Sequence, residues 1–379
     1  MYIDNSTLEA DASRVLDALM SLDAPDMVDR TKTDSENAKN KVFARDFGMD
    51  SWDWPQGVGL YGLTKLQGYY GDARFDGYLK DWFEAREKEG LPSRNVNTTA
   101  PYIALEEYAV RTKNERYAAV CRERAEWLVN GLPKTREGGF QHVTTGFEGK
   151  QSVILNQQQL WVDTLFMAVL FLARAGRDMN EKAWSAEAAK QTLIHIKYLY
   201  EKRHGLFYHG WSFERNDNFG GVFWCRGNAW FSYGALEIIE ALDGETDAGT
   251  LSFIADTFRA QMSAVREVKQ KESGLWHTVL YDVGSYLETS GSAAFCAAMF
   301  KGVRLGLLKE YYIDAAYAAL RGVLARIGSD GLVAGVSTGT GMGMDEEHYR
   351  RIPTAPIGYG QSMTALAIIE ALLYQKSVK

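Results

Sequence analysis

The sequence predicts an all-α fold, namely an (α/α)6 barrel of about twelve helices in inner–outer pairs, with long rim loops and short strands in those loops. Helical periodicity recurs along the whole chain, and strand signals are few. Helices that are apolar all round alternate with helices that carry one charged face, which indicates buried and outer positions respectively. Periodicity alone does not distinguish a closed barrel from an open helical solenoid.

The length and composition of the chain limit the number of domains. It has 379 residues, 46% of them hydrophobic, which is enough for a large core. No Pro/Ser-rich linker, charge block or low-complexity tract interrupts it, so we expect residues 1–379 to form a single domain. The expected helices cover 6–21, 56–69, 73–87, 98–111, 115–130, 157–174, 181–201, 227–242, 247–267, 289–307, 311–327 and 359–375.

The helix over 289–307 shows the inner type, because it is apolar and rich in small residues on every side. The helix over 115–130 shows the outer type, with Arg and Glu along one face. Long loops rich in glycine and aromatic residues follow the outer helices, and loops of this length usually build sites. The stretch "GVSTGTGMGMD" lacks the GK[ST] of a phosphate loop, so we interpret it as a rim loop or lid.

Charge and cysteine content exclude several function classes. The net charge is −7 with both signs mixed along the chain, which argues against nucleic-acid or membrane-surface partners. The first residues show no signal-peptide pattern and the three cysteines show no disulfide framework, so we expect a cytoplasmic protein. The six histidines lack metal-site spacing, so no metal is expected. A homo-oligomer is compatible with the sequence, but nothing in it sets the oligomeric state.

Asp163 is the first candidate for chemistry, because it stands at the start of the apolar run "LWVDTLFMAVLFLA". It could cap a helix beginning at Thr164 or belong to a buried ion pair. Alternatively, Trp161, Leu165 and Phe166 wall the carboxylate. Desolvation would then raise its pKa, so that it holds a proton near neutrality as a general acid must.

A second group lies in "FYHGWSF" and "FWCRGNAWF". Arg226, between Trp224 and Trp230, offers a planar fork suited to a substrate carboxylate. His209 could donate a hydrogen bond or move a proton. A structural hydrogen bond in a loop is the competing interpretation for each of them. His142 and Trp54 lie on other loops of the same kind, and the abundance of aromatic residues would suit stacking against sugar rings.

Several motifs together carry a family resemblance: "NQQQLWVDTLFMAVLFLARAG", "GLFYHGW", "FWCRGNAWF", "GLWHTVLYDVGSYLETSGSAAF" and "GYGQSMTALAIIEAL". In their order and over nearly the whole chain they resemble glycoside hydrolase family 105, the unsaturated rhamnogalacturonyl hydrolases and their relatives. The resemblance implies an (α/α)6 barrel that needs neither a metal nor an organic cofactor. Its substrates would be oligosaccharides that carry a 4,5-unsaturated uronic acid at the non-reducing end.

The resemblance also implies roles for particular residues. The family's catalytic aspartate falls on Asp163, and the pocket residues fall on Trp54, His142, His209, Trp224, Arg226 and Trp230. Many members carry a second pocket aspartate at the start of the fourth helix. Here Asn97 or Thr98 stands instead, and an asparagine can bind a sugar hydroxyl but cannot act as a base.

The expected reaction is hydration of the C4=C5 double bond, with Asp163 as general acid and base. Galacturonyl-rhamnose is the first expectation for the substrate, and galactose or sulfated rhamnose as the second sugar stays open. One alternative is an inverting glycosidase that pairs Asp163 with Asp53 or Asp345 and cleaves saturated uronosides. Another is a sugar-binding helical barrel without catalysis.

Overall fold

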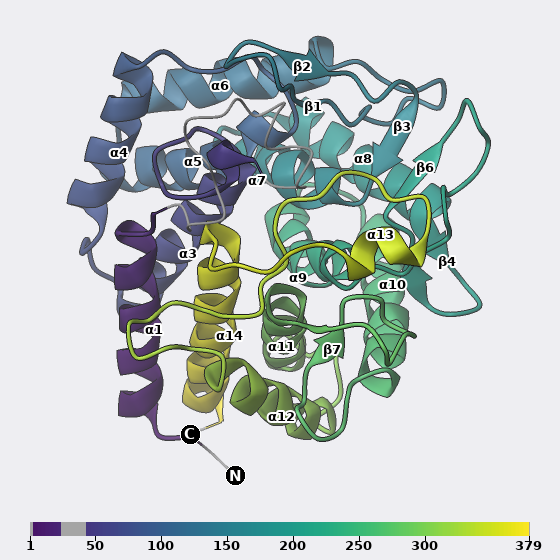
Figure 1. Ribbon diagram of the computed structural model, residues 1–379. Helices are drawn as coiled ribbons and strands as arrows, with labels where there is room; N and C mark the ends of the chain where they lie inside the picture. The colour runs from purple at the N-terminus through teal and green to yellow at the C-terminus, as the bar shows by residue number, and fades with distance from the viewer. Residues whose placement is uncertain (1–2, 24–42, 379) are drawn as a thin grey trace.

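The computed structural model describes residues 3–23 and 43–378 and confirms the predicted helical barrel (Figure 1). Residues 24–42 fall outside these ranges, so a single domain over 1–379 stays a prediction. Six inner helices form the ring: α3 (Trp54–Tyr70), α5 (Pro101–Thr112), α7 (Leu170–Asp178), α9 (Cys225–Leu242), α11 (Thr289–Arg304) and α14 (Gly358–Ser377). Six outer helices cover it: α1 (Asn5–Met20), α4 (Asp76–Lys88), α6 (Glu115–Asn130), α8 (Lys182–Leu199), α10 (Ala248–Glu267) and α12 (Tyr312–Leu324).

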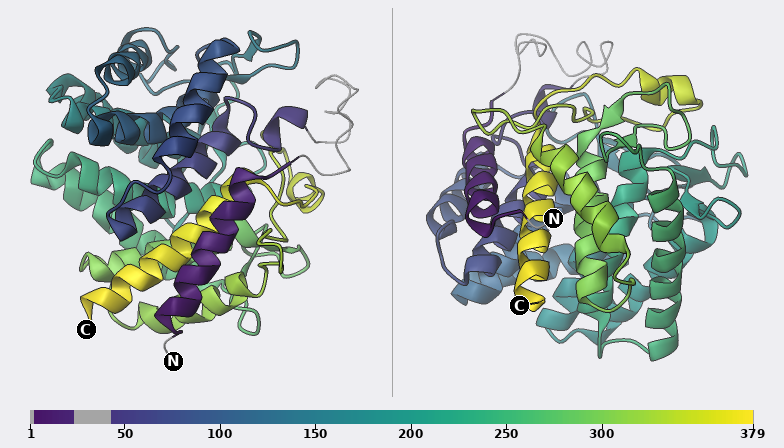
Figure 2. Two further views of the ribbon diagram at one scale, coloured as in Figure 1. Left: turned by 90° about the vertical axis from the view of Figure 1, so that its left-hand side faces the viewer. Right: turned by 90° about the horizontal axis from the view of Figure 1, so that it is seen from below.

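The ring of inner helices is closed. Each inner helix packs against the next along the chain, from α3 through α5, α7, α9 and α11 to α14, and α14 packs back against α3. The first helix of the chain, α1, lies beside the last, α14, and serves as its outer partner (Figure 2). This closure excludes the open solenoid that periodicity alone allows.

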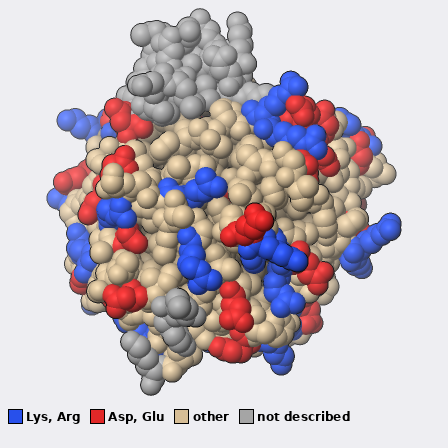
Figure 3. All heavy atoms as spheres, turned by 60° about the horizontal axis from the view of Figure 1, so that its bottom comes forward, with Lys and Arg blue, Asp and Glu red and all other residues tan. Residues whose placement is uncertain are grey.

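The two kinds of helix follow from their side chains. In α11, residues Thr289 to Gly302 are all buried, and their small side chains let neighbouring helices approach closely. In α6, one face is buried through Tyr117, Cys121, Arg124 and Leu128, most other charged residues face outward, and the Asn114 side chain caps the first turn. Charges of both signs are interspersed on the face shown in Figure 3.

Short elements lie in the rim loops. These are η2 (Ala44–Asp46), η3 (Asn97–Thr99), the π-helical turn η4 (Leu165–Val169) that leads into α7, and α13 (Glu346–Arg350). The strands are β1 (Thr144–Thr145), β2 (Val153–Ile154), β3 (Gln159–Trp161), β4 (Tyr200–Glu201), β5 (Leu206–Phe207), β6 (Gly210–Ser212), β7 (Trp276–His277) and β8 (Leu287–Glu288). They form antiparallel pairs, β1 with β2, β3 with β6, β4 with β5 and β7 with β8.

One predicted helix begins too early. The first residues of the helix predicted over 157–174 form strand β3, and helical structure starts only at Asp163. Asn156 and Gln158 adopt a left-handed backbone conformation, which is not that of a right-handed helix. Strand β3 pairs with β6, and in this pairing Trp161 lies opposite Gly210, which is 49 residues further along the chain. Tertiary strand pairing therefore overrides the local helical pattern.

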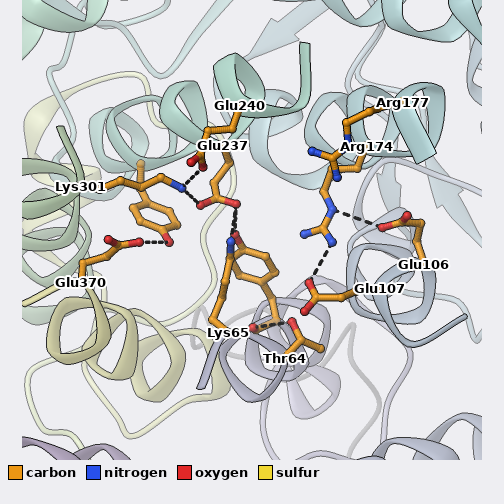
Figure 4. A network of polar contacts seen from close by, with 12 residues as sticks. Thr64, Lys65, Glu106, Glu107, Arg174, Arg177, Glu237, Glu240, Lys301 and Glu370 are labelled. Atoms are coloured by element: carbon orange, nitrogen blue, oxygen red, sulfur yellow. Dashed lines mark hydrogen bonds and ion pairs between the residues drawn. The ribbon is translucent and has the colours of Figure 1, made fainter. Parts of the chain in front are cut away.

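The inner helices all run in the same direction along the barrel. Their N-terminal ends meet the rim loops, and their C-terminal ends converge on a cluster of charged side chains (Figure 4). In the described ranges, no helix combines the length and hydropathy needed to cross a membrane.

Candidate active site

A cavity of about 370 Å³ opens among the rim loops, at the N-terminal ends of the inner helices. Buried residues such as His142, Trp224 and Arg226 line its inner part. Partly or fully exposed loop residues such as Phe147 and Met344 line its mouth. Six of the eight predicted site residues line it: Trp54, Asn97, His142, Asp163, Trp224 and Arg226.

Strand pairing places Asp163 beside His209. In the β3–β6 ladder, Trp161 lies opposite Gly210, and the backbone N–H of Val162 donates to the carbonyl of His209 at 2.9 Å. The next residue, Asp163, therefore comes within 3.1 Å of the His209 ring, measured from Oδ2 to Nε2. Asp163 and Thr164 already belong to the helical segment, and no side-chain cap precedes the turn at Leu165, so Asp163 is not a helix cap.

The electrostatic balance at Asp163 differs from the sequence prediction. Burial raises the pKa of the carboxyl, as predicted, but His209, His142 and Arg226 together outweigh burial and leave the pKa below its ordinary value of 3.8. The prediction of a raised pKa is therefore wrong for the substrate-free protein. It considered the aromatic walls and omitted the surrounding imidazole and guanidinium groups, which favour the ionised form.

His142 is held as a neutral imidazole. Its ring stacks on Trp161 with centroids 4.2 Å apart, and its Nδ1 lies 2.8 Å from the Thr164 hydroxyl. Burial lowers the pKa of His142 to about 3, although the nearby Asp163 carboxylate raises it. A neutral imidazole at this position can orient a water molecule or a sugar hydroxyl, but it is not a reserve of protons.

His209 lies behind Asp163 and is not itself part of the cavity lining. Its Nδ1 lies 2.7 Å from the hydroxyl of Tyr349, a residue of α13, and its ring packs 4.5 Å from Trp224. These contacts fix the ring so that Nε2 faces Asp163. Tyr349 was missed by the sequence analysis, because nothing in "EEHYRR" marks it as a partner of His209.

Arg226 is held by the rim loop. Its Nη1 donates to the carbonyl and the hydroxyl of Ser337, and its Nη2 donates to the carbonyl of Thr338 at 2.9 Å. The guanidinium lies 4.5 Å from the Trp224 ring. Most of its donors therefore hold the segment that leads into the loop at 339–344. Its Nε has no partner among the described residues. The predicted pairing of Arg226 with a uronate stays a prediction.

The tryptophans take different positions. Trp54 lines the cavity and stacks on Tyr359 at 4.5 Å. Trp230 is buried and meets the edge of Trp54 at 6.1 Å, so it lies one layer behind the wall and is not part of the lining. Trp230 can thus orient Trp54, and its position behind the wall does not favour direct contact with a substrate.

The acidic residues that the inverting-glycosidase alternative paired with Asp163 do not lie in the same cavity as Asp163. Asp53 caps α3 at the Trp54 N–H and accepts from the Thr145 hydroxyl at 2.7 Å, and it lines a separate cavity of about 270 Å³. Asp345 caps α13. Neither lines the cavity that holds Asp163. Asp46, in η2, does line it, and the sequence analysis missed this residue because no motif surrounds it.

Asn97 lines the cavity from η3, at the start of the fourth helix of the chain, where the sequence analysis placed it. Within residues 3–23 and 43–378, no three His, Cys, Asp or Glu side chains gather in a group that could hold a metal ion. The groups available in the cavity thus include a carboxylate beside an imidazole, a second carboxylate, a neutral histidine, the guanidinium groups of Arg45 and Arg226, and aromatic walls.

Known proteins resemble this chain in sequence and in fold. A family model described as Glycosyl Hydrolase Family 88 matches residues 26–375. The unsaturated rhamnogalacturonyl hydrolase YesR of Bacillus subtilis is 31% identical over 340 residues, 89% of this chain and 94% of that protein. A crystal structure from Salmonella enterica, described as a possible member of the GH105 family, superposes with a TM-score of 0.89 at 34% identity, over 98% of this chain and 95% of that one. An unsaturated glucuronyl hydrolase of Bacillus sp. GL1 shares the fold, with a TM-score of 0.65 at 17% identity over 98% and 95% of the two chains.

Proposed function

Because this chain matches the Glycosyl Hydrolase Family 88 model and belongs to glycoside hydrolase family 105, it is a glycoside hydrolase, and we propose that it removes a 4,5-unsaturated uronic acid from the non-reducing end of short oligosaccharides. The family resemblance found in the sequence is confirmed. The observation that carries the proposal is the Asp163 carboxylate, which reaches the cavity with 18% of its side chain accessible and has His209 beside it.

The reaction uses the reactivity of the substrate. The C4=C5 double bond carries the ring oxygen on C5 and is therefore an enol ether. Asp163 donates a proton to C4, and the positive charge that forms on C5 is shared with the ring oxygen. Water then adds to C5 and gives its proton to Asp163, which makes a hemiketal. The hemiketal opens to a ketone at C5, and C1 then releases the neighbouring sugar, so one aspartate suffices.

The lowered pKa of Asp163 in the free protein requires a source for this proton. A uronate bound in the cavity brings a second negative charge and displaces water, and both effects raise the pKa of a nearby carboxyl. The Nε2 atom of His209 lies 3.1 Å from Oδ2 of Asp163, so the imidazole is next to the carboxyl that must gain the proton. Asp163 is thus protonated when substrate is bound, the state in which the proton is needed.

The other residues bind and orient the substrate. The neutral His142 orients the attacking water, Asn97 contacts a sugar hydroxyl, and Trp54 and Trp224 form aromatic walls. The relative from Bacillus subtilis supports unsaturated galacturonyl-rhamnose as the substrate. The test is a panel of lyase-generated disaccharides, each with its saturated counterpart. We expect loss of double-bond absorbance for the unsaturated compounds and no cleavage of the saturated ones.

The inverting glycosidase remains as the second candidate because Asp46 supplies another carboxylate to the cavity. In that mechanism Asp46 is as essential as Asp163, and saturated uronosides are cleaved. In the hydration mechanism, Asp46→Asn keeps activity within about tenfold of wild type, since Asn can still bind a sugar hydroxyl. An Asp46→Asn protein that is as inactive as Asp163→Asn, together with cleavage of saturated uronosides, would favour the rival.

A further inference from the structure

Phe219 combines two features that are rarely found in one residue. It lines the cavity, and its backbone is left-handed with a φ of +62°. The other described non-glycine residues with positive φ are Lys113, Asn156, Gln158, Asn180 and Asn216. Phe219 is the one aromatic residue among them, and a bulky side chain makes this conformation costly, by about 1–3 kcal/mol.

The surrounding turn keeps Phe219 in this conformation. Its N–H donates to the Asp217 carboxylate at 3.0 Å, and Asp217 forms a two-way backbone bridge with Ser212 at the end of β6. Gly220 packs directly on the Met344 backbone, where any side chain would collide. The turn is thus attached on one side to the strand that follows His209 and on the other to the rim loop.

Gly210 shows where the ring lies. A Cβ atom on Gly210 would come 3.3 Å from Cε2 of Phe219 and would collide with the methyl group of Met342. The Phe219 ring therefore covers the residue that follows His209, close to the catalytic pair. From there the lining continues through Met342 to the exposed Met344 at the mouth.

The position of Phe219 in the cavity indicates which sugar of the substrate its ring would contact. Only the terminal sugar carries the double bond, so it must reach Asp163, and the second sugar must trail toward the mouth. Phe219 and Met342 both lie over Gly210, the residue that follows His209, and both belong to the lining that includes the exposed Met344. We propose that Phe219 is a specificity-determining residue whose ring packs on the apolar face of the neutral sugar that follows the uronate, and that the strained backbone is kept in order to place that ring. This inference rests on the proposed function.

The test compares two unsaturated substrates of the purified enzyme, a lyase-generated disaccharide and the methyl glycoside of the same unsaturated uronate. Phe219→Ala and Phe219→Gly each remove the ring. Both should lower kcat/KM for the disaccharide by about tenfold and leave kcat/KM for the methyl glycoside unchanged. An equal loss on both substrates, or no loss on the disaccharide, overturns the proposal.

The two variants also report on strain. Glycine adopts positive φ without cost and alanine does not, so Phe219→Gly should unfold at a higher temperature than Phe219→Ala while sharing its kinetic defect. An equal or lower unfolding temperature overturns the claim of stored strain. The matched control is Asn216→Gly, an exposed position of positive φ in the same turn and outside the lining, which should leave kcat/KM for both substrates unchanged.

Failure of the proposed function would look different. In that case the wild-type enzyme would consume the double bond of neither the disaccharide nor the methyl glycoside. If wild type consumes the double bond and the Phe219 variants show no selective loss, only the assignment of Phe219 fails.

Discussion

The buried acidic residues at the two ends of the barrel have different surroundings. At the C-terminal ends of the inner helices, Glu237 contacts Lys301, lies 2.7 Å from Lys65, and accepts from the Tyr61 hydroxyl at 2.5 Å (Figure 4). At the N-terminal ends, Asp163 has the imidazole of His209 at 3.1 Å and also lines the cavity. Glu237 is satisfied by protein alone, whereas Asp163 has room for a ligand.

The same contrast appears in the protonation of the two groups. Burial raises the pKa of Glu237, but Lys301 and Lys65 outweigh burial and hold it well below its usual range. Asp163 reaches a lowered pKa through His209, His142 and Arg226, whose combined effect a substrate carboxylate can offset. Lysines of the protein therefore keep Glu237 ionised, whereas a bound ligand can change the protonation of Asp163.

The largest effect is expected from Asp163→Asn, which should lower kcat by about a thousandfold or more because asparagine has no acidic proton to give to C4. The variant should keep its unfolding temperature and still bind substrate weakly. Turnover is measured by the absorbance of the double bond. The matched control is Asp345→Asn, since asparagine caps a helix as well as aspartate and Asp345 lies outside the cavity lining. Turnover by Asp163→Asn within tenfold of wild type removes Asp163 from the mechanism.

The next effect is on stability and belongs to the other end of the barrel. Glu237→Gln leaves the buried ammonium of Lys301 without its closest counter-charge, which should lower the free energy of unfolding by about 3 kcal/mol. Urea denaturation measures this loss. Glu240→Gln is the control and should cost less, because the Glu240 side chain is 41% exposed. Neither variant should change kcat per folded molecule, and a selective loss of kcat in Glu237→Gln would contradict the division between the two ends.

The smallest effect is a displacement between two pH profiles. Catalysis needs the protonated acid, so activity falls as the pH rises through the pKa of Asp163. In the free enzyme that pKa is below 3.8, and a bound uronate raises it. The profile of kcat/KM reports the free enzyme and that of kcat reports the complex. The decline of kcat should thus begin at higher pH than the decline of kcat/KM. Coincident declines would show that the substrate does not shift Asp163.

The fold follows from the sequence because it depends on a repeated signal. The inner helices are largely apolar around their circumference and the outer helices on one side, so the pattern is repeated around the ring. The error at 157–174 arose where a strand of three residues, β3, is stabilised by a distant partner. Strands this short carry too little periodicity to compete with an adjacent helical pattern.

The sequence predicted only part of the site, and it did so through local motifs rather than through a repeated pattern. Asp163 and His209 came from motifs, and the structure brings them together through the pairing of β3 with β6. The hydrogen bonds of Arg226 to Ser337 and Thr338 join segments 111 and 112 residues apart, and no local pattern encodes them. The sign of the pKa shift at Asp163 was missed for the same reason, because it depends on charges that only the folded chain brings near.

The most direct test of the account follows the proton that Asp163 delivers. The enzyme is incubated with an unsaturated disaccharide in deuterated water, and the released uronate product is examined by NMR. The account predicts one deuterium at C4 of that product with wild type, and no product with Asp163→Asn. Release of the second sugar with the double bond intact, or without deuterium at C4, would contradict it.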